Sequence, residues 1–109
     1  MLQRACYSGV RGERVKFEEH CARSLAAFGR EFPEVHLWLD EFADKPPFGM
    51  RHRRIRHHEA GIREVRELWG ELAAAVARLH IEDDLSQEGW KAGERFPADE
   101  KDYVRMGFF

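Results

Sequence analysis

Apolar residues recur every three or four positions over most of the chain, which places them on one face of an α-helix. This pattern predicts four helices, near residues 13–28, 33–43, 50–69 and 71–80, and a fifth short helix after Pro97. No stretch shows the strict alternation of apolar and polar residues that is typical of a half-buried strand. The predicted fold is therefore all-α, a compact bundle of four to five short helices.

The predicted helix over residues 50–69 has the clearest apolar face. Its inward positions step by three or four residues and are Ile55, His58, Ile62, Val65 and Trp69. At 100° per residue, His57 falls about 100° to one side of His58 and His52 about 120° to the other. His58 is therefore expected in the core, and His52 and His57 on more exposed flanks. Gly61 lies near the inward face and indicates a close approach of another backbone segment.

Length and composition indicate one soluble domain. The 109 residues include eight Phe and three Trp, enough apolar side chains for a single core. Residues 1–12 lack a period and are expected to be a flexible lead-in to a single histidine-rich domain over residues 13–109. Cys6 and Cys21 do not have the spacing of a metal site or of a disulfide scaffold. No signal peptide or membrane-spanning run is found, so we expect a cytoplasmic protein without a membrane partner.

Although the net charge is −2, one segment of the chain is strongly basic. Residues 50–61, MRHRRIRHHEAG, hold three of the six histidines and four arginines, and no acid lies between Asp44 and Glu59. Histidine titrates near neutral pH and is the commonest metal ligand. This block is therefore the part of the sequence that most strongly indicates chemistry.

The histidines and nearby acids predict a metal site. Ligands in helical bundles project inward from several helices, and zinc accepts imidazole nitrogen and carboxylate oxygen. The candidate ligands are His20, His36, His57, His58, His80 and Asp84. His58 would be the core ligand, with His20 and His80 as its first partners and Asp40 as an alternative carboxylate to Asp84. The leading hypothesis is a divalent-metal-binding domain, for zinc or another divalent ion.

A metal-dependent hydrolase is one form of this hypothesis, because a bound water with a pKa near ~7 supplies hydroxide at neutral pH. No motif for a nucleotide cofactor is found. The partner would be a metal ion or an unidentified small molecule. The sequence leaves the oligomeric state open, and also whether the protein is an enzyme.

Two alternatives remain open. The basic block of residues 51–58 would suit a non-enzymatic module that binds nucleic acid or an acidic partner. Its basic patch comprises Arg51, His52, Arg53, Arg54 and Arg56. In the other alternative the histidines and arginines only build a polar core without a site, with Arg51 or Arg54 paired to Asp40 or Glu41.

Several motifs together resemble a known family. They are HxWxD at residues 36–40, RHRxxRHHxxGI at residues 51–62 and HxxxDL at residues 80–85, with His20 and Ser24 preceding them. This arrangement resembles a small bacterial and phage domain of unknown function. Since that family has no assigned activity, the resemblance implies a shared pattern and a bacterial or phage setting, but no mechanism.

Overall fold

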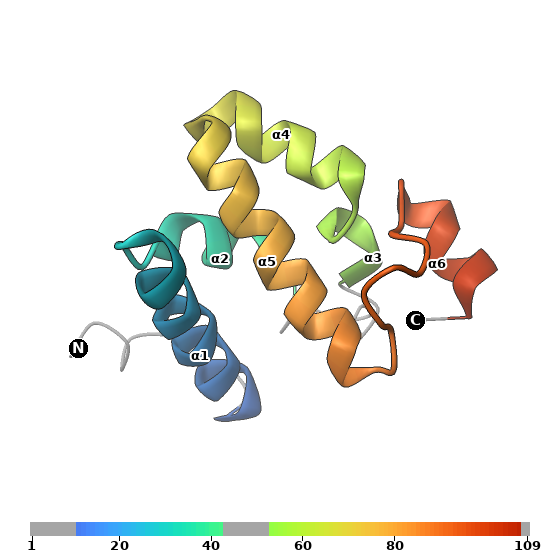
Figure 1. The fold of residues 1–109 in the computed structure, drawn as a ribbon, viewed down its shortest axis with the longest axis horizontal. Coiled ribbons are helices and arrows are strands. Elements are labelled where there is room, and N and C mark those ends of the chain that lie inside the picture. The colour runs from blue at the N-terminus through green and yellow to red at the C-terminus, as the bar shows by residue number, and fades with distance from the viewer. Residues whose placement is uncertain (1–10, 43–52, 108–109) are drawn as a thin grey trace.

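The computed structural model describes residues 11–42 and 53–107, which form helices only (Figure 1). The helices are α1 (Arg11–Phe28), α2 (Pro33–Leu39), α3 (Arg53–Arg56), α4 (Glu59–Trp69), α5 (Glu71–Gln87) and α6 (Glu100–Met106). Five of them have seven residues or more, whereas α3 is a single turn of four residues. No strand occurs within the described ranges, so the predicted all-α fold is confirmed.

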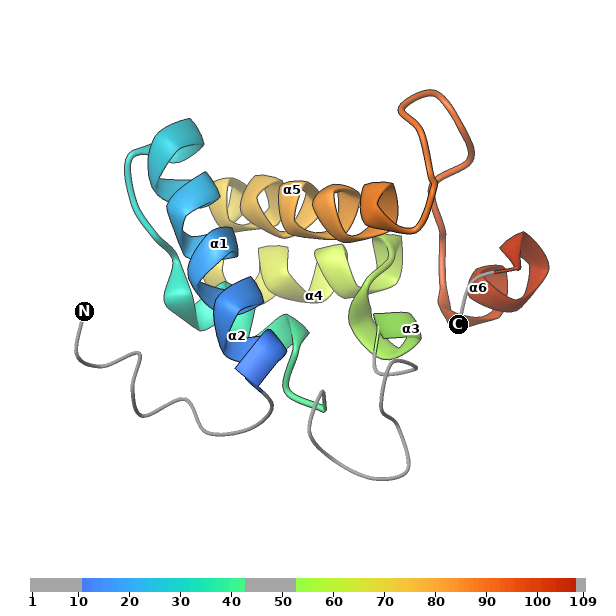
Figure 2. The ribbon, with the colours of Figure 1, turned by 90° about the horizontal axis from the view of Figure 1, so that it is seen from below.

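Helix α5 is the central element of the bundle. It contacts α1, α2 and α4, and after the turn at Gly70 it runs back alongside α4 (Figures 1 and 2). Helix α3 contacts α4 and α6, which lies at the other end of the molecule from α1. None of the described helices combines the length and the apolar character that a membrane span requires.

An apolar core fills the space between α2, α4 and α5. Its fully buried members include Val35 and Leu39 of α2, Val65 of α4, and Ile81 and Leu85 of α5. Burial of such side chains stabilises a fold by about 1.5–3 kcal/mol each. The centre of the bundle is therefore held by α2, α4 and α5, which fixes the backbone positions of the polar residues between them.

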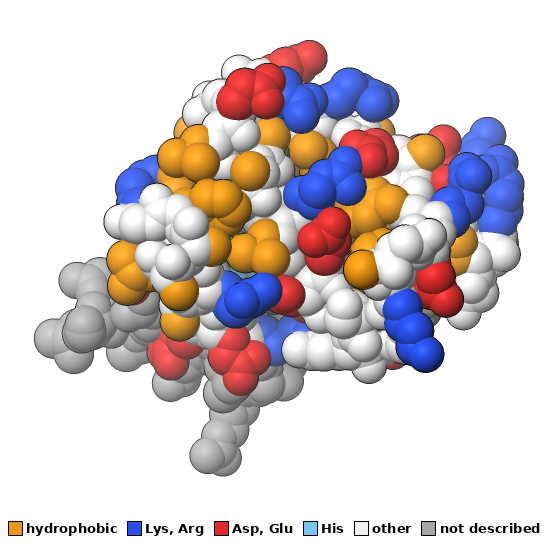
Figure 3. Space-filling model, in the orientation of Figure 1, with side chains coloured by type: hydrophobic (Ala, Val, Ile, Leu, Met, Phe, Trp, Pro, Cys, Tyr) orange, Lys and Arg blue, Asp and Glu red, His pale blue; other side chains and the backbone are white. Residues whose placement is uncertain are grey.

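Several large apolar side chains are exposed, among them Trp69, which was predicted to point inward. Leu25 of α1, Trp69 of α4 and Leu72 of α5 are 50%, 40% and 51% exposed. Trp69 and Leu72 lie on either side of the turn at Gly70, and Trp69 has an edge-on ring contact with Trp38. Figure 3 shows apolar side chains gathered on the surface over the adjoining parts of α1 and α5.

Several helices begin or end at the residues that the sequence predicted. Helix α2 begins at Pro33, and α1 ends at Phe28 before Gly29, whose φ of +84° suits glycine. Helix α5 differs, because it continues to Gln87 instead of ending near His80. Its acidic residues, predicted to lead out of the helix, remain helical because Asp83 and Asp84 find basic partners on α1.

The predicted helix over residues 50–69 is wrong as a single element. It is divided into α3 and α4, and the break lies at His57 and His58. His58 is the N-cap of α4, where its Nδ1 accepts a hydrogen bond of 3.1 Å from the backbone N–H of Gly61. The turn brings Arg56 against Gly61 so closely that a Cβ atom at Gly61 would overlap the Arg56 carbonyl oxygen. The close backbone approach predicted at Gly61 is thus confirmed, and it belongs to this turn.

Two predictions fall partly outside the described residues. Helix α1 begins at Arg11, and residues 1–10 of the predicted lead-in are not described. Arg51 and His52 of the predicted basic patch also lie outside the described ranges.

Candidate metal centre

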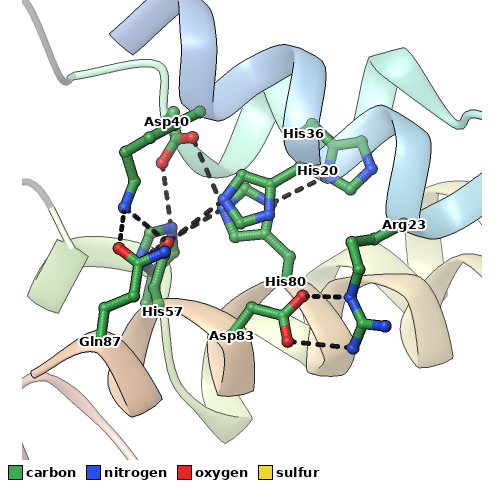
Figure 4. A network of polar contacts seen from close by, with 10 residues as sticks. His20, Arg23, His36, Asp40, His57, His80, Asp83 and Gln87 are labelled. Carbon is green, nitrogen blue, oxygen red and sulfur yellow. Dashed lines mark hydrogen bonds and ion pairs between the residues drawn. The ribbon is translucent and has the colours of Figure 1, made fainter. Parts of the chain in front are cut away.

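Seven polar side chains meet in the interior of the bundle, and Figure 4 labels His20, His36, Asp40, His57 and His80 among them. They are His20 and Ser24 of α1, His36 of α2, Asp40 at the end of α2, His57 between α3 and α4, and His80 and Asp84 of α5. All are buried, and the most accessible is the Asp40 side chain, which is 9% exposed. On the face drawn in Figure 3, histidine side chains are accordingly almost absent.

Helical spacing accounts for most of this convergence. Residues four apart lie on the same face of a helix, and the cluster contains three such pairs. The pairs are His20 with Ser24, His36 with Asp40, and His80 with Asp84. Each pair faces the space between α1, α2 and α5. His57 joins them from the break between α3 and α4, where the chain turns inward.

Four of these side chains form a group that has the spacing of a metal site. Asp40, His57, His80 and Asp84 each offer a donor atom within 4.8 Å of the others. His57 Nε2 lies 3.2 Å from Asp40 Oδ1, and His80 Nε2 lies 3.5 Å from Asp40 Oδ2 and 3.4 Å from Asp84 Oδ2. A tetrahedral ion with bonds of about 2.0–2.1 Å separates its donors by about 3.3–3.4 Å. These three separations are close to that edge length, with Asp40 facing His57 through Oδ1 and His80 through Oδ2.

A hydrogen-bonded chain supports the far side of His80. The Nδ1 atoms of His80 and His36 are 2.8 Å apart, and His36 Nε2 is 2.7 Å from Ser24 Oγ. Since His80 Nε2 faces the carboxylates, we assign the Nδ1 proton of His80 as the donor to His36 Nδ1. His36 then donates its Nε2 proton to Ser24. This arrangement fixes the ring of His80 with Nε2 directed toward the two acids.

His20 covers the remaining face of His80. The two rings are stacked with centroids 3.6 Å apart, and the nitrogens of His20, His36 and His80 form a second group of atoms within 4.8 Å. Figure 4 shows Asp40 and His57 on one side of this stacked pair and His36 on the other.

The two oxygens of Asp84 have different surroundings. Oδ1 lies 3.2 Å from His20 Nε2 and 3.2 Å from Lys16 Nζ, which also donates to Gln87 at 2.7 Å. Oδ2 faces His80, and lies 3.8 Å from His57 Nδ1. With Oδ1 held by basic groups, the geometry favours Asp84 as a ligand through Oδ2 alone.

The acids control the charge on His80. Burial alone would lower the pKa of His80, but the carboxylates of Asp40 and Asp84 outweigh it and raise this pKa to about 9. Burial acts to raise the pKa of Asp84, yet its hydrogen bonds with His20 and His80 hold that pKa well below the usual range. At neutral pH an ion-free centre therefore holds an imidazolium at His80, next to an ionised Asp84.

The other three imidazoles are neutral near pH 7. Burial lowers the pKa of His57 to about 4 and that of His36 to about 3. Burial, with the charge on His80, also lowers the pKa of His20. A neutral ring is the form in which histidine binds a metal, so His57 needs no change of charge to act as a ligand.

The structure brings together five of the six predicted ligands. They are His20, His36, His57, His80 and Asp84. His58 is separate, because its Nδ1 caps α4 and its Nε2 lies 3.0 Å from the Ile55 carbonyl oxygen. His58 is buried as predicted but outside the cluster, whereas the prediction that His57 lies on an exposed flank is wrong, since the helix break turns its ring inward. Asp40 joins the group together with Asp84 rather than in place of it.

Lys16, Gln87 and the link from Ser24 to His36 were not predicted as parts of the centre. Lys16 lies one helical turn before His20, and Gln87 lies three residues after Asp84. This spacing was a visible signal that they share a helix face with cluster members. Nothing in the sequence indicated that the two faces meet.

Arg56, in the described part of the basic block, makes its contacts with other residues of the domain. The Arg56 guanidinium lies 4.0 Å from the centroid of the Trp38 ring, donates to the Trp38 carbonyl oxygen at 2.7 Å, and pairs with Glu41. Glu41 is thus paired with Arg56, whereas Asp40 faces imidazoles. The side chains of Arg53 and Arg54 lie outside the described part of the structure.

The chain belongs to a family described as a domain of unknown function, DUF6915, whose model matches residues 15–90. The resemblance found in the sequence is confirmed. The match spans all members of the cluster, from His20 to Asp84, and ends before α6. No curated protein and no solved structure matches the chain significantly.

Proposed function

We propose that this domain binds one divalent transition-metal ion through Asp40, His57, His80 and Asp84. The observation that carries the proposal is the spacing of these donors, which approach from three separate segments and lie within 4.8 Å of one another. Two carboxylates also supply the two negative charges that balance a divalent ion.

The donor set indicates the class of ion. Two imidazole nitrogens suit zinc, copper, nickel or iron, whereas calcium and magnesium prefer oxygen ligands throughout. The surroundings support the same class, because metal-bound histidines usually donate their other N–H to a fixed acceptor. His80 has such an acceptor in His36. Zinc is therefore the first ion to test.

Four protein donors favour a closed site. A tetrahedral ion that is bound by four side chains has no position left for water, whereas a catalytic zinc site has three protein ligands and an open position. The proposal is accordingly metal binding, and it does not include the hydrolase that the sequence allowed. A stable ion at this point would tie α2, α5 and the break before α4 together.

Metal content of protein purified without a polyhistidine tag tests the proposal. We expect one ion per chain by elemental analysis. Zinc at about 100 times its dissociation constant should stabilise the fold by about 2.7 kcal/mol, which raises Tm by about 10 °C. Substoichiometric metal, together with no thermal shift on adding zinc, manganese or nickel, would instead support the polar core without a site.

Proton release gives an independent prediction. Because the pKa of His80 is raised to about 9, an ion must displace one proton from His80 at neutral pH. Lower pH protonates His80 and weakens binding, so the affinity for zinc should rise about tenfold per pH unit toward pH 9 and level off above it. Calorimetry in buffers of different ionisation enthalpy at pH 7 should detect one proton released per ion. Affinity that is independent of pH over this range would argue against His80 as a ligand.

A further inference from the structure

Helices α1 and α5 meet across a polar seam. Lys16, His20 and Arg23 lie on one face of α1, opposite Asp83, Asp84 and Gln87 of α5. The contacts are Lys16 to Gln87 at 2.7 Å, His20 to Asp84 at 3.2 Å, and Arg23 to Asp83 at 2.9 and 3.1 Å. Three charged or polar pairs therefore follow one another along the seam, beside the candidate metal centre.

Helix α1 is joined to the bundle differently from α2, α4 and α5. Within the described part of the chain, no α1 residue is among the fully buried members of the central apolar cluster. The Arg23–Asp83 pair is partly exposed, and exposed ion pairs contribute only about 0–1 kcal/mol. The Arg23–Asp83 pair at the surface is thus the weak contact of the seam, whereas the His20–Asp84 contact beneath it is buried.

A surface pocket of about 420 Å³ opens on this seam. Its lining residues are Glu19, His20, Ala22, Arg23, Asp83 and Gln87. His20 belongs both to this pocket and to the buried cluster, and its ring is 5% exposed. On its inner side the ring stacks on His80 and contacts Asp84. One imidazole therefore separates the pocket from two of the proposed ligands.

We propose that the divalent ion reaches and leaves the centre through this pocket, and that the His20 ring must move aside to let it pass. This inference rests on the proposed metal binding. Arg23 offsets the charge of Asp83 at the pocket, and Glu19 leaves its lining with an excess of one acid, which favours the approach of a cation. His20 Nε2 lies 3.2 Å from Asp84 Oδ1 and its ring stacks on His80, so movement of this ring would expose two of the proposed ligands to the pocket.

Filling the pocket tests the route. Ala22→Trp places a large side chain in it, whereas Ala26→Trp, one turn later on α1, is an exposed control outside the lining residues. Zinc uptake and release to a chelator are measured by stopped flow, and the affinity by equilibrium titration. We expect Ala22→Trp to slow both rates about tenfold or more with little change in affinity. Ala26→Trp should behave as the unchanged protein does.

His20→Ala provides the opposite test. Removing the ring opens the way from the pocket, so uptake and release should both become faster. A merely weakened site would release zinc faster without faster uptake, and that result would overturn the role of His20. This variant also decides the matter if Ala22→Trp does not fold.

The outcomes separate the route from the proposed function. If the unchanged protein binds one zinc ion but Ala22→Trp exchanges it at the normal rates, the route is overturned and metal binding stands. That result would indicate that the ion enters the centre beside Asp40, the most accessible member of the cluster. If no ion binds, the proposed function and the route both fail.

Discussion

Replacing His57 with Asn is expected to lower the affinity for zinc by more than about 100-fold, whereas the same change at the adjacent His58 leaves it unchanged. Loss of groups that only support a ligand already costs about 10–100-fold, and His57 is a proposed ligand. Its ring is fully buried, with Nε2 3.2 Å from Asp40. Asn keeps a polar side chain of similar volume at this position without an imidazole nitrogen.

His58→Asn is the matched control. His58 caps α4 from outside the cluster, and Asn is among the best N-cap residues, so the helix should keep its start. Affinity is measured for both variants by competition with a chelating dye, and the fold of each by circular dichroism without metal. Equal losses for the two variants, or full affinity in a folded His57→Asn protein, would contradict the proposed ligand set.

Spacing within single helices made much of the centre predictable. The pairs His36 with Asp40 and His80 with Asp84 share a helix face however the helices pack, because the four-residue spacing alone sets this. In the structure each pair adjoins an apolar face, since Val35 and Leu39 border His36 and Ile81 and Leu85 border Asp84. Local periodicity therefore placed the members of each pair together before their partners were known.

The break before α4 was not predictable from the same periodicity. Ile55 and Ile62 continue the three- and four-residue steps across it, so the pattern passes through the turn without a visible interruption. Histidine is not a usual N-cap residue, and no Ser, Thr, Asp or Asn marked the start of α4. The sequence consequently placed only His58 in the interior, whereas the structure buries both rings and brings only His57 into the cluster.

Contacts between distant segments were beyond sequence reasoning for a different reason. Lys16 and Gln87 are 71 residues apart and touch only because α1 lies along α5. The acidic run after Ile81 resembles a helix end when the chain is considered by itself. It stays helical because Arg23 and His20 pair with Asp83 and Asp84. The continuation of α5 to Gln87 is thus a tertiary effect.

Gly61→Ala is expected to destabilise the domain by about 3 kcal/mol or more, although Gly61 lies inside a helix. Intrinsic helix propensity alone predicts the opposite sign, a gain of about 1 kcal/mol from Ala. The added Cβ would overlap the backbone carbonyl of Arg56, which cannot move aside as a flexible side chain would. Chemical denaturation with and without zinc measures the change, and a more stable variant would contradict the structure of the turn.

Gly29→Ala is the reference for this substitution. Gly29 has a φ of +84°, and no heavy atom lies within 4 Å of a Cβ built there, so only backbone strain of about 1–2 kcal/mol is expected. Backbone conformation alone would rank Gly29 as the more sensitive position, whereas the close contact ranks Gly61 first. The turn at Gly61 also sets the direction of the His57 side chain. Gly61→Ala should therefore weaken zinc binding in whatever fraction still folds, while Gly29→Ala should lower stability and leave the affinity intact.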